Sequence, residues 1–299
     1  MTVTDNLHVK TANRVSVVSI IVNVFLSAVK LAAGILAHSA ALVSDAVHSL
    51  SDVLSTAAVI AGVNLSARKA DEGHQYGHER IESIFSILLS VLLFATGVSI
   101  GIAGVQAVIS GSYREAVMPG VAALAAALLS IAVKEWMYHY TIHAAKSIRS
   151  TALKADAWHH RSDALSSVGS FAGILLARLG FPIFDPIASV IICVFIIKAA
   201  YDIFKEATDE LVDKSAGEEV GERLKAAIMA QDGVMSIDSL KTRIFGAKLY
   251  VDVEIGCNGE WTLYRAHSVA ENVHDSIENS FPEVKHCMVH VNPKSVSVN

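Results

Sequence analysis

Apolar residues dominate the first two thirds of the chain in stretches that are long enough to form membrane-spanning helices. The stretches lie at about 15–37, 40–66, 83–109, 117–138, 153–177 and 187–204. The third is the clearest, because no Asp, Glu, Lys, Arg or His occurs from Ile84 to Ile109. A hydrocarbon core of roughly 30 Å requires only about 20 such residues in a helix. The pattern predicts six transmembrane helices in residues 15–206, preceded by a polar cytoplasmic segment at 1–14.

The pattern changes after about residue 205, where charged residues become frequent and the apolar runs shorten. Apolar and polar positions alternate in Lys248–Ile255, which is the period of a half-buried strand. The predicted elements are, in order, a helix at Gly217–Gln231, strands near Ser239–Ile244 and at Lys248–Ile255, a helix from Thr262 to about Ser280 and a strand at Cys287–Val291. This order predicts a small cytoplasmic α/β domain of the ferredoxin-like kind over residues 207–299.

Composition and charge agree with a membrane protein and set its orientation. Hydrophobic residues make up 53% of the chain and charged residues 18%, and the mean hydropathy is +0.46. Basic residues flank one side of the predicted helices at Lys10, Arg14, Arg68, Lys69, Arg80, Lys146, Arg149, Lys154, Lys205 and Lys214, and the other side at Arg114 and Arg178. Because basic residues gather on the cytoplasmic side, both termini are predicted to be cytoplasmic. The net charge of -5 gives no reason to expect a nucleic-acid partner, and three widely spaced cysteines exclude a disulfide scaffold.

The second and fifth apolar stretches contain nearly the same sequence. Residues 45–55 read DAVHSLSDVLS and residues 156–166 read DAWHHRSDALS, which agree at seven of eleven positions. In a helix, His at i and Asp at i+4 lie on one face, about one turn apart. Two such helices facing each other present two imidazoles and two carboxylates to a common point, which makes a tetrahedral site suited to Zn²⁺. The predicted ligands are His48, Asp52, His159 and Asp163.

Carboxylates in these stretches need a partner or a purpose, because one near the bilayer centre costs at least about 2.5 to 3.5 kcal/mol. The alternative to a metal site is that each His bonds the Asp of its own helix as a structural pair. Asp45 and Asp156 precede their histidines by three residues. We expect them to accept a hydrogen bond from an imidazole or to be structural, with a third-ligand role left open. His160 and Arg161 lie on other faces of the helix, and packing or a helix-end role is expected for His160.

The two His-x-x-x-Asp pairs, the six-helix layout and the αββαβ tail resemble the cation diffusion facilitator family of divalent metal/proton antiporters. The resemblance runs from about Val15 to Pro293. It implies that the two pairs, His48 with Asp52 and His159 with Asp163, form the transport site within the membrane. A His at the first position resembles the zinc-transporting members more than the manganese-transporting ones. Zn²⁺ is therefore the expected substrate, with Fe²⁺, Mn²⁺, Cd²⁺ and Co²⁺ as alternatives.

A second candidate metal site lies between the second and third stretches. Asp71, His74 and His78 fall at i, i+3 and i+7 in a glycine-containing loop and can converge on a surface ion. The alternative is a polar loop whose histidines are only solvated. The resemblance implies a peripheral metal site with this spacing. It also implies that Arg80, just after the loop, pairs with Asp213 after the sixth helix and locks the two domains together.

The resemblance places the ligands of a cytoplasmic metal site at Asp238, His267 and His290. One further position, an Asp in some relatives, is Asn292 here, and an amide is a poor ligand. His286 and Cys287 lie next to the last strand and are alternative ligands, although a solvated His and a buried Cys explain them equally well. The resemblance also implies that the tail forms a homodimer and tightens when it binds metal.

These expectations combine into a proton-coupled exporter of a divalent metal ion, first of all Zn²⁺, in the lipid bilayer of a bacterial inner membrane. A neutral imidazole binds metal and an imidazolium does not, so protons and Zn²⁺ compete for His48 and His159. No enzymatic activity is expected, because the sequence has no HExxH-type helix with an acid/base Glu. A membrane-anchored metal sensor that does not transport is the main alternative. An organic-cation exporter is less favoured, because aromatic residues are 7% of the chain and do not cluster around the repeat.

Overall fold

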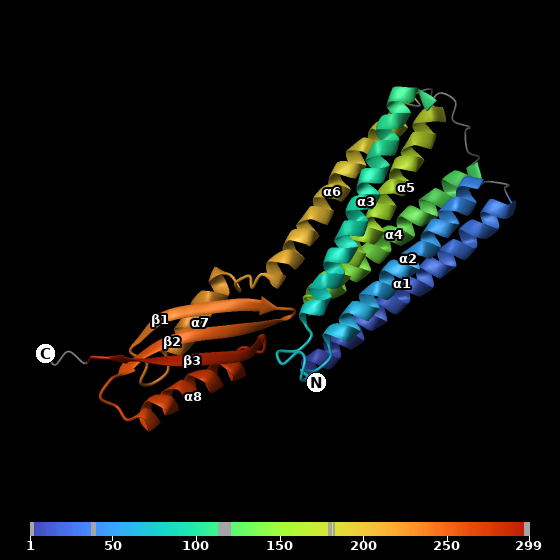
Figure 1. Ribbon diagram of the computed structural model, residues 1–299. Helices are drawn as coiled ribbons and strands as arrows, with labels where there is room; N and C mark the ends of the chain where they lie inside the picture. The colour runs from blue at the N-terminus through green and yellow to red at the C-terminus, as the bar shows by residue number, and fades with distance from the viewer. Residues whose placement is uncertain (1–2, 37–39, 113–120, 179–180, 182, 296–299) are drawn as a thin grey trace. The chain divides into compact units, whose positions relative to one another are not determined.

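The chain divides into two compact units, Met1–Thr208 and Asp209–Asn299. The structure is a computed structural model that describes residues 3–36, 40–112, 121–178, 181 and 183–295. The first unit consists of long helices, and the second combines helices with a three-stranded sheet (Figure 1). The domain boundaries expected from the sequence, together with the roles of the two domains, stay predictions.

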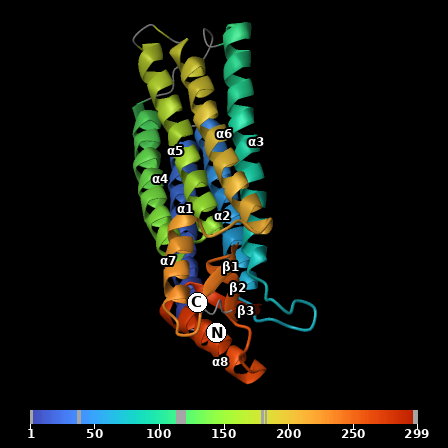
Figure 2. The same ribbon diagram turned by 90° about the vertical axis from the view of Figure 1, so that its left-hand side faces the viewer.

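Long helices that run alongside one another build the first unit, as both views show (Figures 1 and 2). They are α1 (Val3–Leu36), α2 (Ala40–Ser66), α3 (Arg80–Ser110), α4 (Val121–Ile148), α5 (Thr151–Arg178) and α6 (Phe184–Leu211). Each follows one of the predicted apolar stretches, but several continue beyond it. α4, for example, ends at Ile148 instead of near residue 138. A helix can extend past its apolar segment because its backbone hydrogen bonds are internal and hold in water as well as in lipid.

The first unit exposes apolar side chains and buries polar ones. Ile21, Phe25 and Phe195 are 61%, 63% and 62% exposed, whereas Asn23 and Lys134 are 0% and 1% exposed. Every buried polar or charged side chain among the described residues belongs to this unit. An apolar surface around a polar interior is stable only in an apolar solvent. The unit is therefore suited to a bilayer.

Length and composition alone identify two membrane-spanning candidates among the described residues, His8–Ala32 and Arg80–Ser110. They belong to the first and third predicted stretches. α2, α4, α5 and α6 contain side chains outside the described residues, so this criterion does not cover them in full. For those helices the membrane assignment rests on what they bury, which the chain's composition does not reveal.

A tight turn joins α4 to α5 and sets the two helices antiparallel. Arg149 adopts the left-handed backbone with φ 54°. The Ser150 hydroxyl oxygen then accepts the backbone N–H of Leu153 at 3.1 Å, which caps the start of α5. Lys134 on α4 and Asp163 on α5 both lie roughly 20 Å from this turn at 1.5 Å per residue. The turn therefore brings them to the same level of the bundle.

Glycines allow α3 and α6 to approach closely. A Cβ atom on Gly97 would lie 2.9 Å from Cγ2 of Ile196, and one on Gly101 would lie 2.7 Å from Sγ of Cys193. Real Cβ atoms do not come this close to other heavy atoms, so larger residues at these positions would push the helices apart. Small residues four apart are typical of helix contacts in membranes, where close packing replaces the hydrophobic driving force.

The second unit has the helix, strand, strand, helix, strand order that the sequence predicts. Its elements are α7 (Glu218–Met229), β1 (Ser236–Phe245), β2 (Lys248–Asn258), α8 (Leu263–Ser280) and β3 (Val284–Lys294). The sheet order is β1-β2-β3, with β1 antiparallel and β3 parallel to β2. Gly246, with φ 61°, closes the β1–β2 hairpin, and α8 makes the crossover that a parallel pair requires.

The core of the second unit is apolar throughout. Leu224 and Ile228 of α7 and Val273 and Ile277 of α8 are fully buried against the alternating apolar residues of β2. Thr262 caps α8, as predicted, by accepting the backbone N–H of Arg265. These contacts give the unit a hydrophobic core of its own.

Candidate functional site

The structure brings Asp52 on α2 together with His159 and Asp163 on α5. One ligand atom from each of these side chains lies within 4.8 Å of the others. All three side chains are buried, with 2%, 7% and 8% exposed. Nε2 of His159 lies 3.4 Å from Oδ1 of Asp52. The two copies of the repeated sequence therefore face each other, as the helical spacing predicts.

The fourth predicted ligand, His48, lies in α2, but its side chain is outside the described residues, as is that of Asp45. His48 precedes Asp52 by one helical turn and so shares its helix face. Its role as a ligand stays a prediction.

Sequence reasoning missed the side chain at the centre of this cluster, Lys134 of α4. Its Nζ donates to Oδ2 of Asp52 at 2.5 Å and to Oδ2 of Asp163 at 2.9 Å. Lys134 is 1% exposed. A charged residue inside a predicted membrane helix is a signal of function, and Lys134 carried that signal in the fourth apolar stretch. It was read as part of an ordinary span, although a helix that continues to Ile148 leaves it far from the end.

The electrostatics explain why Lys134 is there. Two buried carboxylates at close range repel each other and have lost their water, so a cation between them is needed. The ammonium group of Lys134 contacts one oxygen of each and leaves a formal charge of -1 on the three groups together. The cluster is therefore a cation site, and an internal cation holds its centre.

A second pair of titratable groups lies beside the cluster. Asp156 is fully buried, accepts the hydroxyl of Thr56 at 3.0 Å and lies 3.5 Å from Nε2 of His160. The bond from Thr56 ties α2 to α5 one level away from Asp52. Arg161 lies over the ring of Tyr138 at 4.3 Å. In the structure, Asp156 and Arg161 contact α2 and α4 respectively, whereas His160 contacts Asp156 of its own helix.

The loop residues Asp71, His74 and His78 also converge, with ligand atoms within 4.8 Å of one another. Nδ1 of His78 lies 3.1 Å from the carbonyl oxygen of Lys69. A carbonyl only accepts, so this nitrogen donates, and Nε2 of the same ring faces Oδ2 of Asp71 at 3.4 Å. The backbone N–H of His74 donates to Asp71 and lowers the pKa of its carboxyl group. The loop holds an ionised carboxylate and an oriented imidazole toward one point.

The tail residues Asp238, His267 and His290 are not brought together within this chain. Of the groups of three or more potential ligands that the described residues form, none contains this set. Asp238 instead accepts the Lys294 ammonium at 2.8 Å, and this bond is the main cause of its lowered pKa. Asn292 donates to the same carboxylate at 3.0 Å. His267 lies 3.3 Å from Glu271 on its own helix.

The alternative tail ligands lie elsewhere. Cys287 is 1% exposed, and burial raises the pKa of its thiol to about 12, so it stays protonated at neutral pH. His286 contacts Glu278 of α8. Arg80 is the first residue of α3, and Asp213 belongs to the second unit, where it has φ 62°. The pairing of Arg80 with Asp213 stays a prediction.

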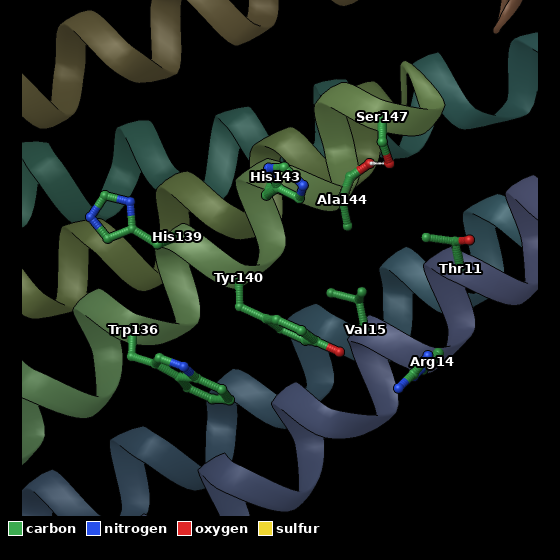
Figure 3. Close-up of a pocket in the computed structure, with 9 residues that line it drawn as sticks. All are labelled: Thr11, Arg14, Val15, Trp136, His139, Tyr140, His143, Ala144 and Ser147. Carbon is green, nitrogen blue, oxygen red and sulfur yellow. Dashed lines mark hydrogen bonds between the residues drawn. The ribbon is translucent and has the colours of Figure 1, made fainter.

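A groove of about 550 Å³ between α1 and α4 is separate from the cluster of Asp52, His159 and Asp163 (Figure 3). Tyr140 reaches from α4 toward Val15 on α1, and its ring stacks on that of Trp136 with centroids 5.4 Å apart. The lining contains no carboxylate. His139 and His143 supply imidazoles, but the groove lacks the mixed set of imidazole and carboxylate donors that the cluster has.

Family profiles match both units of the chain. Residues 16–212 match the cation efflux transmembrane domain, and residues 216–294 match the cytoplasmic domain of cation efflux proteins. The chain belongs to the cation diffusion facilitator family. The predicted family is thereby confirmed, and membership makes this chain a membrane transporter for the efflux of divalent metal cations.

Individual relatives of this cation diffusion facilitator cover nearly the whole chain. It is 35% identical over 277 residues to the uncharacterized transporter MJ0449 of Methanocaldococcus jannaschii, covering 92% of this chain and 96% of the relative. It is 31% identical over 289 residues to the manganese efflux system protein MneP of Bacillus subtilis, covering 94% and 96%. The solved structure MamM-CTD 215-293 matches 25% of this chain at 24% identity, with a TM-score of 0.25.

Proposed function

We propose that this cation diffusion facilitator exports Zn²⁺ in exchange for protons, through a site formed by His48, Asp52, His159 and Asp163. The main support is the buried convergence of Asp52, His159 and Asp163 from the two copies of one repeated sequence. A mixed set of imidazole and carboxylate donors suits tetrahedral Zn²⁺. The same donors accept Fe²⁺, Mn²⁺, Cd²⁺ and Co²⁺, which are the alternative substrates.

Lys134 makes the site an exchanger of cations in this proposal. A dication bound between Asp52 and Asp163 takes the position that the ammonium holds in the structure. With an effective dielectric constant of about 20, the repulsion between a +1 and a +2 charge 4 Å apart is roughly 8 kcal/mol. The two cations therefore exclude each other. Metal entry displaces the ammonium, and its return helps to expel the metal.

In this proposal, protons compete with the metal ion for the imidazole ligands. A protonated imidazole cannot bind a metal ion, so a proton that arrives at His159 or His48 competes with Zn²⁺. The site loads metal from the cytoplasm and releases it when protons arrive from the outer side. Protons are thus the counter-ion of transport.

The proposal also includes the membrane, the orientation of the chain in it and the association of two chains. All six long helices cross the inner membrane of a bacterial cell, with both termini in the cytoplasm, and the basic residues near one set of helix ends support this orientation.

Two chains associate through their second units. The dimer-forming family to which the second unit matches supports this, and Leu263 and Tyr264, 85% and 83% exposed, offer apolar surface for it. The loop residues Asp71, His74 and His78 bind a peripheral metal ion.

Flux measurements on purified protein in liposomes test the proposal. We expect Zn²⁺ to move against an imposed pH gradient, and expect Asp52→Asn and Asp163→Asn to lower that flux at least 100-fold, because each removes a charged ligand while keeping its shape. Asp202→Asn is the matched control, since Asp202 is an exposed carboxylate that pairs with Lys198 on α6. Each divalent ion is then tested in turn.

Three results would each contradict a part of the proposal. Flux that persists in both carboxylate variants would show that Asp52 and Asp163 do not bind the transported ion. Metal binding without any flux in the wild type would favour the membrane-anchored sensor instead. Flux that needs no pH gradient, and creates none, would show that protons are not the counter-ion of transport.

A further inference from the structure

Three side chains of the second unit gather where α8 meets β3. His274 and Glu278 come from α8, and His286 comes from β3. One ligand atom from each lies within 4.8 Å of the others. Oε1 of Glu278 is 3.4 Å from Nε2 of His274 and 3.0 Å from Nδ1 of His286. This set, the tail triad, shares no residue with Asp238, His267 and His290.

Local structure explains the convergence. His274 and Glu278 are four residues apart and therefore share one face of α8. β3 is one of the two edge strands of the sheet, and the register shifts near its start, so that Val284 pairs with Leu249 and His286 with Tyr250. Lys285 is thus an extra residue in β3. Bulges of this kind redirect neighbouring side chains, and here His286 meets the helix.

The hydrogen bond of His274 to a backbone carbonyl turns its other nitrogen toward Glu278. Nδ1 of His274 lies 2.7 Å from the carbonyl oxygen of Cys287, which can only accept, so Nδ1 donates. In the neutral ring Nε2 then carries a lone pair, and this lone pair faces the carboxylate of Glu278. Two acceptors at such a distance need a cation between them, and either a proton, which makes His274 an imidazolium that donates to Glu278, or a metal ion meets this need. A metal-bound histidine is held in the same way, with its far nitrogen bonded to a carbonyl.

The carboxylate is held in place as well. Oε1 of Glu278 accepts the backbone N–H of Cys287 at 3.0 Å, in addition to the contact with His286. The side chains of the triad are about one third to one half exposed, so an ion can reach them. Ligands of a tetrahedral zinc ion with bonds of about 2.0 to 2.1 Å lie about 3.3 Å apart, close to the separations from Glu278.

We propose that the tail triad binds a divalent transition-metal ion such as Zn²⁺ within a single chain, with two imidazoles and one carboxylate as ligands and water completing the coordination. Nδ1 of His286, which donates to Glu278 in the structure, binds the ion once the proton of the ring lies on Nε2 instead. The bound ion fastens the second half of α8 to the start of β3. This inference does not depend on the transport function proposed above.

Hydrogen exchange of the full-length protein in detergent micelles tests the proposal, with Zn²⁺ as the probe. We expect Zn²⁺ to slow amide exchange at least tenfold in residues 274–288 of the wild type. The His274→Gln, His286→Gln double variant should lose this protection and bind about one Zn²⁺ fewer per chain. Glu271→Gln, which changes an exposed carboxylate on the same helix, should keep both.

Glu278→Gln guards against a folding artefact, because the amide oxygen still accepts the N–H of Cys287 while the charge is lost. We expect its exchange without metal to match the wild type and its response to Zn²⁺ to disappear. The proposal is overturned if the wild type shows no protection in residues 274–288. It is also overturned if the double variant keeps the protection, or if His267→Gln abolishes it while the triad variants do not.

Discussion

The two units of this transporter differ in where their charged side chains lie. The first buries Asp52, Asp163 and Lys134 inside a bundle whose outside is apolar, whereas the second has an apolar core and keeps its charged and histidine side chains at the surface. In the first unit, buried charges must be neutralised by another part of the chain. In the second unit, water solvates the charged side chains at the surface. Potential ligands there are therefore oriented by hydrogen bonds and need no internal cation. The same ligand chemistry therefore comes with an internal competitor in one unit and without one in the other.

The largest effect should follow from removing that competitor. Lys134→Met keeps an unbranched side chain, shorter by one atom, but leaves two buried carboxylates without their cation. We expect the affinity of the proposed transport site for Zn²⁺ to rise at least tenfold, about 1.4 kcal/mol, and the metal-free protein to unfold at a lower temperature than the wild type. Titration calorimetry and thermal unfolding with and without Zn²⁺ measure both.

Lys198→Met is the control for this variant, because it removes an exposed lysine that pairs with Asp202. A folded Lys134→Met protein with unchanged or weaker Zn²⁺ affinity would show that Lys134 supports the fold and does not compete with metal.

The next prediction concerns the close packing of α3 against α6 in the first unit. Gly101→Val places atoms where Sγ of Cys193 already lies, since even a Cβ would be 2.7 Å away. We expect it to destabilise the first unit by about 1 to 3 kcal/mol, as overpacking does. Thermal unfolding in micelles measures the loss. Adding Cys193→Ala makes room beside α3, and failure of this second change to recover stability would argue against the α3–α6 contact.

Thiol reactivity tests the dry core of the second unit. Burial, with the charges of Glu278 and Asp252 adding to it, raises the pKa of Cys287 from 9.0 to about 12. We expect alkylation of Cys287 by iodoacetamide at pH 8 to be at least 100-fold slower in the folded protein than in urea. Mass spectrometry of the peptide that contains Cys287 follows the reaction, and rapid labelling of folded protein would show that the core is open.

The same shift predicts how stability changes with pH. The folded state holds the thiol proton more tightly than the unfolded state, so this contribution is complete below pH 9 and is lost as the pH rises from about 9 toward about 12. Cys287→Ala should flatten that part of the unfolding profile.

The smallest effect should come from a glycine that packs against nothing. Gly221 lies inside α7, and a Cβ there would meet no heavy atom within 4 Å. Gly221→Ala should therefore stabilise the second unit by roughly 0.5 to 1 kcal/mol, because alanine loses less entropy in a helix. Urea unfolding checks this, and destabilisation would mean that α7 is not helical there.

The sequence predicted much of this arrangement because the relevant spacings are local. His159 and Asp163 share a helix face at any helical geometry, and the repeat shows that Asp52 sits on a matching face. The spacing of Asp71, His74 and His78 predicted the cluster that the loop forms. The order of helices and strands in the second unit followed from the periods of its apolar residues.

Other features were decided only by tertiary contacts. Lys134 is 82 residues from Asp52 and 29 from Asp163, so no local pattern joins them. The tail triad depends on a bulge in β3 and on a carbonyl that fixes one imidazole. Asp238 bonds to Lys294 in this chain, a contact that no local pattern predicts, and its role as a metal ligand stays a prediction. A helix fixes which residues share a face, whereas the partner across the bundle depends on how the chain folds back, and buried charges make that partner essential.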